Sequence, residues 1–524
     1  MKGKVFLVGA GPGDPGLITL KGLRLLQQAE VVVYDFLASP ELLKHIPKEA
    51  EIIYVGKKGG DHTLPQNEIN QLIINKALLG KRVVRLKGGD PFIFGRGGEE
   101  AEELAKAGIS FEVVPGVTSA IAVPAYAGIP LTHRRYNASV AFFTGHEDPT
   151  KEGQALDWAK LSTGVETLVF LMGAKNLSAI VEKLIRNGRP AETPSALIQW
   201  GTTSRQKTVT GTLNTIVQEA DEAALGPPAV LVVGKIVELR EKLNWFEKRP
   251  LLGKTVVVTR TREQASELIN QLTDLGAECL EFPTIRIVPP ADWSELDQAL
   301  LRIEEYNWII FSSPNGVRFF FHRIKMLNLD LRSLKGIKIG VIGPATARVL
   351  AEYHLRPDLM PKKYQAEYLL EALSQLTLTK QNILIPRAKQ ARDVLPEGLR
   401  QRGAEVSVVS AYQTLSAPEG KEQLEEKLSQ RAIDCLTFTS SSTVENFLIL
   451  FPEQGIRSLL QKVTVACIGP ITAQTARDNG LAVHIVAKEY TIPGLVRAIE
   501  KYYRGQNSES RSQNKSSLNT NSLL

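Results

Sequence analysis

Short apolar runs alternate with amphipathic stretches along the first half of the chain. The runs are KVFLV, EVVVY, EIIYV, RVVRL, FEVVP, SVAFF, TLVFL, SALIQ and AVLVV. Each has the length and the Val, Ile and Phe content of a β-strand, and the stretches between them have the pattern of amphipathic helices. This alternation predicts a fold of the α/β class.

The second half carries an internal repeat. Four short matches lie in nearly one register: 311–313 with 438–440, 343–347 with 469–473, Arg260 with Arg387, and the GAE of 276–278 with that of 403–405. The separations are 126 or 127 residues. Two copies are too few for a solenoid, so the repeat predicts two similar lobes with a cleft between them.

A composition change divides the chain. The stretch KLNWFEKRPLLGK, near 242–254, is charged and contains a proline, and a fresh strand, KTVVVTR, follows it. We therefore predict a first part over 1–243, a linker over 244–251 and a second part over 252–503. The final residues, 504–524, are rich in Ser and Asn with almost no apolar content, which predicts a disordered tail.

Bulk composition excludes several classes of protein. The 524 residues are 43% hydrophobic and 23% charged, as in ordinary globular proteins. The net charge of +7 suits an anionic partner but is too small to indicate nucleic acid. Neither a membrane-spanning run nor a signal peptide is visible. Three dispersed cysteines predict a reduced, cytoplasmic protein, and the histidine and cysteine spacing predicts no metal site.

The loop after the first strand matches a dinucleotide-binding pattern. Residues 11–16 satisfy G-x-G-x-x-G, and Asp35 ends the next apolar run, where a ribose-binding acid would stand. However, Pro12 and Pro15 lack an N–H group and have a fixed φ angle. The loop therefore suits packing against an uncharged ligand better than holding phosphates.

Two further loops follow other strands. Gly88, Gly89 and Asp90 allow close backbone approach and end in a carboxylate, while Thr118 and Ser119 stand at a predicted helix start. Each loop alone is explained by turn chemistry and capping. Together they resemble loops at the carboxyl ends of strands, where open α/β sheets bind ligands.

These motifs carry a family resemblance over 1–243. They are VGAGPGDPGLITLKG, VVVYD, VGK, LKGGDPFIFGRGGEE, PGVTSA, IPLTHR, TLVFLMG and GPPAVLVVGKIV. The segment resembles the tetrapyrrole methylases, and most closely the uroporphyrinogen-III C-methyltransferases. The resemblance implies two α/β domains, a homodimer and S-adenosylmethionine (SAM) as methyl donor. It places SAM at Pro12, Gly88, Gly89, Asp90, Ile93, Thr118, Ser119, Met172 and Gly201.

The same resemblance implies acid–base roles for two residues. Asp35 would be the proton acceptor and Lys57 a proton donor. Asp35 could also be an ordinary strand-end acid, and Lys57 a contact to a substrate carboxylate. Candidates to hold the eight carboxylates of uroporphyrinogen are basic residues, each of which could instead be simple surface: Arg85, Lys87, Arg96, His133, Arg134 and Arg135.

The second part resembles the uroporphyrinogen-III synthases. The segments that carry this are FSSPNGV, IGPATA, AYQT, FTSSSTVENF and CIGPITAQTARDNG. The resemblance implies two α/β lobes, 252–284 with 415–503 and 285–414, and closure of hydroxymethylbilane with inversion of ring D, without a cofactor. Tyr412 would assist departure of the hydroxyl group, or else only pack between the lobes. Substrate carboxylates would be held at Ser313, Thr346, Ser440, Ser442 and Thr472, which could otherwise be helix caps.

The sequence thus predicts a bifunctional enzyme that makes uroporphyrinogen III and methylates it twice to precorrin-2. The expected partners are small tetrapyrroles, with no nucleic acid and no membrane. A dehydrogenase or chelatase domain is not expected, so metal insertion would occur elsewhere. Two alternatives stay open: a methylase that acts on RNA, and a second part that is a ligand-binding sensor.

Overall fold

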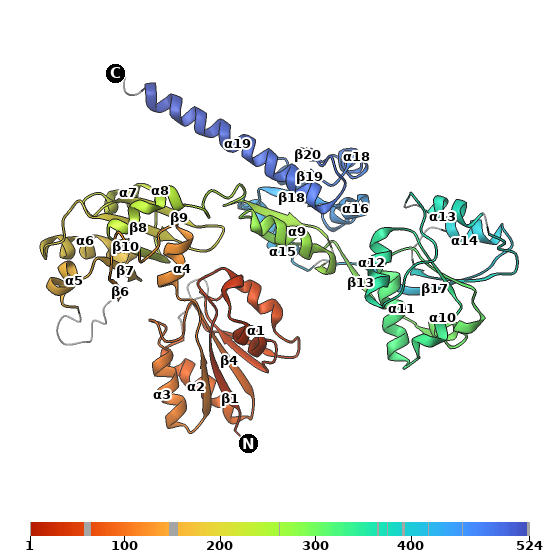
Figure 1. Ribbon diagram of the computed structural model, residues 1–524, viewed down its shortest axis with the longest axis horizontal. Helices are drawn as coiled ribbons and strands as arrows, with labels where there is room; N and C mark the ends of the chain where they lie inside the picture. The colour runs from red at the N-terminus through yellow and green to blue at the C-terminus, as the bar shows by residue number, and fades with distance from the viewer. Residues whose placement is uncertain are drawn as a thin grey trace. The chain divides into compact units, whose positions relative to one another are not determined.

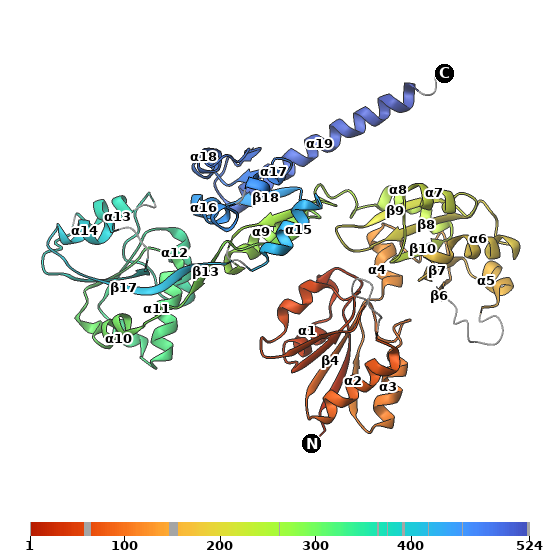
Figure 2. The same cartoon turned by 180° about the vertical axis from the view of Figure 1, so that it is seen from behind.

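The computed structural model describes residues 2–56, 64–145, 156–260, 262–363, 366–374, 376–389, 393–417, 419–452 and 454–520. The chain forms two compact units (Figures 1 and 2). The first unit comprises Met1–Lys254, Leu272–Glu278 and Gln506–Leu524, and the second comprises Thr255–Gln271 and Cys279–Gly505. Each unit is described by itself below.

A parallel five-stranded sheet begins the first unit. Its strands, in the order β3-β2-β4-β1-β5, are β1 (Lys4–Gly9), β2 (Val31–Tyr34), β3 (Glu51–Tyr54), β4 (Arg82–Lys87) and β5 (Ser110–Val114). The accompanying helices are α1 (Leu20–Leu26), α2 (Gln66–Leu78) and α3 (Gly97–Lys106). Val31–Val33 of β2 are buried, as expected for a parallel sheet covered on both faces. All five carboxyl ends therefore meet at one edge.

A mixed sheet follows in the same unit, in the order β6-β7-β10-β8-β9. Its strands are β6 (Val140–Thr144), β7 (Thr167–Leu171), β8 (Pro194–Gln199), β9 (Lys207–Thr212) and β10 (Ala229–Val233). The helices are α4 (Ser119–Tyr126), α5 (Trp158–Gly164), α6 (Leu177–Arg186), α7 (Ile216–Glu222) and α8 (Arg240–Leu243). Helix α4 packs on this sheet through Ala120 and Val123, so it connects the first sheet's loops to the second sheet.

The second unit contains two sheets. One has the order β12-β11-β18-β19-β20 and the other β13-β17-β16-β14-β15. The strands of the first are β11 (Thr255–Val258), β12 (Glu278–Glu281), β18 (Cys435–Phe438), β19 (Thr464–Cys467) and β20 (Ile485–Val486). Those of the second are β13 (Ile285–Val288), β14 (Trp308–Phe311), β15 (Lys338–Val341), β16 (Asn382–Ala388) and β17 (Glu405–Ser416).

The helices of the second unit lie between these strands in the chain. They are α9 (Arg262–Asp274), α10 (Ser294–Leu301), α11 (Pro314–Met326), α12 (Pro344–Glu352), α13 (Ala366–Leu373), α14 (Val394–Arg400), α15 (Lys421–Ser429), α16 (Ser441–Leu450), α17 (Gln454–Leu460), α18 (Pro470–Asp478) and α19 (Ile492–Thr520). The 3₁₀ helices of the whole chain are Pro15–Leu17, Pro40–His45, Ala174–Asn176, Lys235–Leu239, Ile303–Glu305 and Leu331–Leu334.

The internal repeat explains the likeness of these two sheets. In the repeat register, β11 and β12 correspond to β16 and β17, while β14 and β15 correspond to β18 and β19. The sheet orders β12-β11-β18-β19 and β17-β16-β14-β15 are therefore the same. The predicted pair of similar lobes is confirmed, but each lobe combines strands from both copies of the repeat.

The junction differs from the predicted linker over 244–251. Phe246 is 4% exposed and Leu251 is fully buried. Glu247 accepts hydrogen bonds from Gln206 and Thr208. The segment is thus packed within the first unit, because its aromatic and apolar residues are buried. The charged residues between them made the segment look like an exposed linker in the sequence.

The predicted disordered tail over 504–524 also differs from the structure, in which α19 continues to Thr520. Its first turns are buried at Leu495, Val496 and Ile499. Adding a residue to an existing helix costs far less than starting one, so a helix begun by these buried turns can extend through a polar segment that contains no proline.

Candidate functional site

Two glycine-rich loops lie side by side at the carboxyl edge of the first sheet. The Gly89 N–H donates to the Gly11 carbonyl at 2.7 Å, and the Gly11 N–H donates back at 3.2 Å. The φ angles of Gly11 and Gly89 are +80° and +68°. Side chains rarely tolerate such angles, so glycine is required at both points where the loops meet.

Asp90 joins the second loop to the third. Its Oδ1 accepts the N–H groups of Phe92 and Ile93, at 2.8 and 3.1 Å, and its Oδ2 accepts the Gly116 N–H at 2.9 Å. A Cβ at Gly116 would overlap the Gly89 carbonyl oxygen. Asp90 therefore organises the loops through backbone contacts on both carboxylate oxygens.

The third loop ends at the N-terminus of α4. Thr118 caps this helix by accepting the Ala120 N–H at 3.3 Å, and it is 7% exposed. Ser119 is the first helical residue. A Cβ at Gly89 would lie 3.7 Å from the Ser119 nitrogen, in ordinary van der Waals contact. The glycine thus leaves open the space before a helix N-terminus, where N–H groups are available to a ligand.

Asp14 connects the first loop to the second sheet. Its N–H donates to Thr202 Oγ1 at 3.1 Å, and its Oδ2 accepts the Tyr126 hydroxyl at 2.7 Å. Its Oδ1 accepts the Gly16 N–H, which orders the loop itself. Burial, and then the hydrogen bond to Asp14, raise the pKa of Tyr126. A neutral phenol therefore holds residues 11–16 in place.

Two further loops come from the second sheet. Met172 follows β7, is 52% exposed and has a φ of 57°. Gly201 follows β8, and a Cβ there would overlap Val123. Trp200 lies beside it, with its ring centroid 5.9 Å from that of Phe36. This ring contact connects the segment after β2 to the loop after β8.

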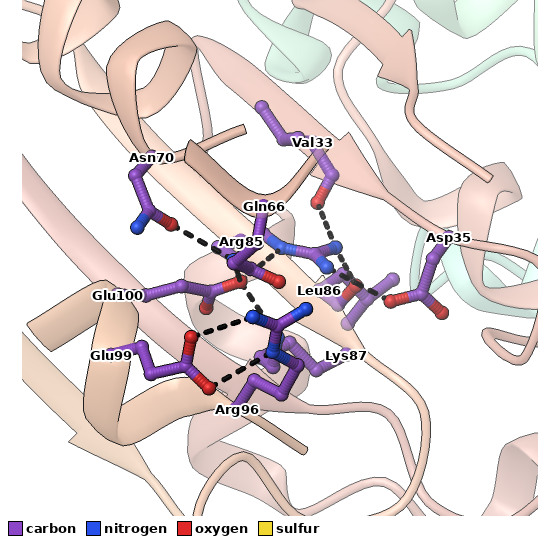
Figure 3. A network of polar contacts seen from close by, with 10 residues as sticks. All are labelled: Val33, Asp35, Gln66, Asn70, Arg85, Leu86, Lys87, Arg96, Glu99 and Glu100. Atoms are coloured by element: carbon purple, nitrogen blue, oxygen red, sulfur yellow. Dashed lines mark hydrogen bonds and ion pairs between the residues drawn. The ribbon is translucent and has the colours of Figure 1, made fainter. Parts of the chain in front are cut away.

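A network of charged residues fills the interior behind Asp35 (Figure 3). Arg85 Nη2 lies 3.0 Å from Asp35 Oδ2, and Arg85 Nε lies 3.2 Å from Glu100 Oε1. Lys87 Nζ lies 2.7 Å from the same Glu100 oxygen. Gln66 also donates to it, at 3.2 Å. Arg85, Lys87 and Glu100 are 3%, 4% and 1% exposed, so these charges are paired inside the protein.

Asp35, Arg85, Lys87 and Glu100 form a charge network. Within it, burial has the largest effect on the pKa of Lys87. Burial lowers the pKa of Lys87, Arg85 lowers it further, and Glu100 opposes both. Two cations face two carboxylates. Removing one partner of a buried ion pair typically destabilises a protein by about 3–5 kcal/mol, because the remaining charge is left uncompensated.

In the second unit, Tyr412 and Ser313 lie together. Tyr412 is on β17, is 8% exposed and stacks on Phe319, with ring centroids 5.8 Å apart. Its hydroxyl oxygen lies 2.9 Å from Ser313 Oγ, which also accepts the Gly316 N–H as the N-cap of α11. Burial raises the pKa of Tyr412, so the phenol is a proton donor at neutral pH.

The equivalent loop of the other lobe repeats this arrangement at a helix start. Ser440 is the N-cap of α16 and forms a capping box with Thr443. The Oγ atoms of Ser440 and Ser442 lie 2.9 Å apart. Thr346 and Thr472 occupy the same position in the first turns of α12 and α18, and both are buried.

Comparisons with known proteins match both parts of the chain. The family model described as Tetrapyrrole (Corrin/Porphyrin) Methylases matches residues 4–217, and that described as Uroporphyrinogen-III synthase HemD matches residues 266–497. The porphyrin biosynthesis protein HemD of Ruminiclostridium josui is 41% identical over 496 residues, which are 94% of this chain and 97% of that protein. The chain belongs to this family of fused methylases and synthases.

Two further similarities are to C-methyltransferases. The uroporphyrinogen-III C-methyltransferase of Bacillus subtilis is 44% identical over 332 residues, 63% of this chain and 68% of that protein. The crystal structure of uroporphyrin-III C-methyl transferase from Thermus thermophilus, complexed with S-adenyl homocysteine, is 40% identical. It covers 45% of this chain and 100% of that one, with a TM-score of 0.40.

The methylase half brings most residues predicted to bind SAM onto connected loops. Gly88, Gly89, Asp90, Thr118 and Ser119 lie on the hydrogen-bonded loops described above. Pro12 is half-buried on the first loop, and Ile93, at 42% exposure, follows Asp90. Their role in binding stays a prediction. Lys57 lies outside the described residues.

The basic residues divide into two groups. Arg85 and Lys87, candidates to hold substrate carboxylates or else simple surface, are buried on the protein carboxylates Asp35 and Glu100, so the surface alternative is wrong for both. Strand β4 is the central strand of its five-stranded sheet, so its residues after Arg82 are buried on both faces. Its charged residues made these positions look exposed in the sequence. Arg96, Arg134 and Arg135 are exposed, and His133 is half-buried. Arg96 forms an ion pair with Glu99.

Sequence reasoning missed Asp14, Tyr126, Thr202 and Glu100. Asp14 lies inside the quoted loop motif and could have been noticed as an N-cap before Pro15. Glu100 ends the motif GRGGEE and looks like any acid in a first helical turn. The partners of Tyr126 and Thr202 are more than 100 residues away, so no local signal existed.

Within the described residues, no group of three or more His, Cys, Asp or Glu side chains could hold a metal ion. No helix in that part of the chain is long and apolar enough to cross a membrane.

Proposed function

We propose that the protein is a bifunctional enzyme of tetrapyrrole biosynthesis. The synthase half cyclises hydroxymethylbilane to uroporphyrinogen III, and the methylase half transfers two methyl groups from SAM to pyrrole β-carbons, giving precorrin-2. The observation that carries the assignment is the fusion of both family domains in one chain, matched along 94% of its length by a relative of the same organisation.

We propose that SAM binds among the loops at 10–16, 88–94, 116–119 and 200–202. The glycine at position 89 supports this, since a Cβ there would stand 3.7 Å from the Ser119 nitrogen, directly before the N-terminus of α4. Pro12 offers a stiff apolar surface without an N–H group. SAM supplies an electrophilic methyl group, and these loops would orient it toward the substrate.

Asp35 is the proposed proton acceptor. It directly follows β2, and the residues after it contact two of the loops: Phe36 meets Trp200, and Leu37 lies against Gly88. The electron-rich pyrrole carbon forms a bond to the methyl carbon as the carbon–sulfur bond breaks, and a proton then leaves the macrocycle. A carboxylate at this edge is suited to accept it. Positioning supplies most of the acceleration, because the substrate is already nucleophilic.

In the synthase half, Tyr412 is the proposed hydrogen-bond donor to the departing hydroxyl group. The carbon–oxygen bond breaks, and the hydroxyl group takes up a proton and leaves as water. The resulting cation closes on ring D, rearranges and loses a proton, so the net change is the loss of one water. We propose no cofactor for this half. Ser313, Thr346, Ser440, Ser442 and Thr472 stand at helix starts, which supports a role in holding carboxylates.

Finer features of the assembly are also proposals. We expect a homodimer formed through the methylase half, which light scattering of the purified chain would test. We expect a cytoplasmic enzyme, since Cys279, Cys435 and Cys467 form no disulfide in the structure. Thiol labelling in intact cells would test this, and all three cysteines should be found reduced.

One experiment tests both activities. The purified chain is incubated with hydroxymethylbilane, with and without SAM, and the porphyrins are identified by isomer and methyl count after oxidation. We expect type III product without SAM and dimethylated product with it. Type I isomer alone would contradict the synthase assignment, and unmethylated type III in the presence of SAM would contradict the methylase assignment.

A further inference from the structure

The carboxylate of Asp35 is held at both oxygens. Oδ2 accepts Arg85 Nη2 at 3.0 Å, and Oδ1 accepts the Leu37 N–H at 3.2 Å. The side chain is 28% exposed, so one face still reaches solvent. Two donors on opposite oxygens fix the plane of a carboxylate, and this is the group that the proposed function uses as proton acceptor.

Arg85 is in turn held on all three nitrogens. Nε donates to Glu100 Oε1, Nη2 to Asp35, and Nη1 to the carbonyl oxygens of Leu86 and Val33, at 3.1 and 3.4 Å. The guanidinium is planar, so its plane cannot turn without breaking several of these bonds. Arg85 is therefore a rigid connection between Glu100 and Asp35 (Figure 3).

The negative charge of Glu100 matters more to this network than its hydrogen bonds do. Its Oε1 accepts donors from Arg85, Lys87 and Gln66, whereas its Oε2 is buried without a hydrogen-bond partner among the described residues. A neutral amide could accept the same three donors through one oxygen. What a carboxylate adds at this position is a negative charge, at the cost of a desolvated second oxygen.

We propose that Glu100 and Arg85 are positioning residues for methyl transfer. Glu100 is the buried counter-charge that holds Arg85 against Asp35, and together they fix the orientation of the accepting carboxylate. This rests on the proposed function of Asp35. A purely structural reason is weak, because well-packed apolar side chains stabilise a core as well as buried ion pairs do or better.

The geometry of the charge network predicts that losing either charge disturbs the accepting carboxylate. Asp35 faces Arg85 and Lys87 of β4, Tyr34 of β2, Tyr54 of β3 and Glu100 of α3, while Lys57 lies outside the described residues. Without the charge of Glu100, Arg85 loses the buried counter-charge that holds it against Asp35. Without the guanidinium of Arg85, the Oδ2 atom of Asp35 loses its hydrogen-bond donor.

The test uses the full chain with uroporphyrinogen III and SAM. In Glu100→Gln the amide oxygen can keep the three hydrogen bonds and only the charge is lost. We expect kcat for methyl transfer to fall about tenfold, with SAM affinity by calorimetry unchanged within about twofold. In both Glu100→Gln and Arg85→Gln the loss should fall on kcat, with the KM for uroporphyrinogen III changed by no more than about twofold.

Controls come from the same chain. Glu103→Gln changes an exposed acid on the same helix, paired with Lys106, and should match the wild type. The synthase activity of each variant reports the amount of folded chain for its own half, and SAM binding reports the methylase half. Arg85→Lys keeps the charge without the planar fork and should lower kcat with SAM affinity unchanged, which preserves the test if Glu100→Gln does not fold.

The two levels of the hypothesis fail differently. If Asp35→Asn methylates at the wild-type rate, the proposed role of Asp35 is wrong. If Asp35→Asn is inactive but Glu100→Gln has the wild-type kcat, only the positioning role is overturned. A loss of kcat in both Glu100→Gln and Arg85→Gln that is accompanied by an equal loss of SAM affinity also overturns it, since that indicates a merely structural contribution.

Discussion

The hydroxyl oxygens of Tyr412 and Ser313 lie 2.9 Å apart, although the two residues are 99 positions apart in the chain. Ser313 Oγ already accepts the Gly316 N–H, which leaves it one lone pair and its own hydrogen. If Ser313 donates that hydrogen to Tyr412, the phenol proton is left for the departing hydroxyl group of the substrate. In this arrangement Tyr412 is the hydrogen-bond donor to the substrate, and Ser313 orients its hydroxyl group.

Replacing Tyr412 with Phe keeps the ring stacked on Phe319 and removes only the hydroxyl. We expect the synthase kcat to fall about three- to tenfold, and the fraction of type I isomer to rise as spontaneous closure competes. Chromatography of the oxidised porphyrins measures both. Tyr353→Phe, which alters another stacked phenol of the same lobe, is the control. Full activity and type III purity in Tyr412→Phe would exclude the donor role.

Replacing Gly89 with Ala should impair SAM binding. The residue has a φ of +68°, and its added Cβ would fill the space before Ser119. We expect SAM affinity, measured by calorimetry, to fall at least about tenfold, with about 1 kcal/mol of backbone strain. Gly108→Ala is the matched control: its φ is +63°, and the nearest atom to its Cβ would be Lys2 Nζ. Equal losses of SAM affinity in both variants would indicate strain alone.

Replacing Tyr126 with Phe removes the hydroxyl that holds Asp14. We expect a loss of about 1 kcal/mol in unfolding free energy and weaker SAM binding, since Asp14 loses its hydrogen bond to α4 and keeps the one to Thr202. The folded-state pKa of Tyr126 is raised by burial and by Asp14. Its contribution is therefore complete below the unfolded pKa of about 10 and is lost as the pH rises above that value.

Chemical denaturation at pH 8 and at pH 10.5 measures this contribution. The difference in stability between wild type and Tyr126→Phe should shrink at the higher pH. Tyr136→Phe, another half-buried tyrosine of the first unit, should show neither effect. A difference between wild type and Tyr126→Phe that is unchanged by pH would show that the hydroxyl bond to Asp14 contributes nothing.

Cys467 should resist alkylation in the native protein. Burial raises the pKa of its thiol to about 11, so at pH 8 it is protonated as well as inaccessible. The thiol is more acidic in the unfolded chain, with a pKa of about 8.5, so its contribution to stability is complete below that pH and declines as the pH rises toward 11. Peptide mapping after iodoacetamide treatment should find Cys467 modified only in denaturant. Rapid native labelling would contradict the burial.

The strands of the methylase half were readable from the sequence, with one exception. Nine predicted runs correspond to β1–β8 and β10, because each concentrates Val, Ile, Leu or Phe in a short segment. Strand β9, KTVTGT, was missed. It lies at the edge of its sheet and is half-exposed, so its threonines, lysine and glycine carry no apolar signal.

The candidate site was readable only in part. Loops that follow strands of a parallel sheet share one edge, so Gly89 and Thr118 could be grouped from the chain order. The hydrogen bond between Asp14 and Tyr126 could not be predicted, because it depends on how helix α4 packs. Nor could the burial of Arg85 and Lys87, since alternation along a strand does not reveal that both faces are covered.

The sequence by itself determined the class of fold, the positions of most strands and the existence of a repeat in the second half. The repeat itself did not show which strands share a sheet: the family resemblance implied, and the tertiary structure decided, that β11 and β12 of one copy join β18 and β19 of the other, while β16 and β17 join β14 and β15. Strands pair through backbone groups that are the same in every residue, so a repeat in side chains does not specify which copies share a sheet. Burial of complete hydrophobic faces, a property of the whole chain, makes that choice.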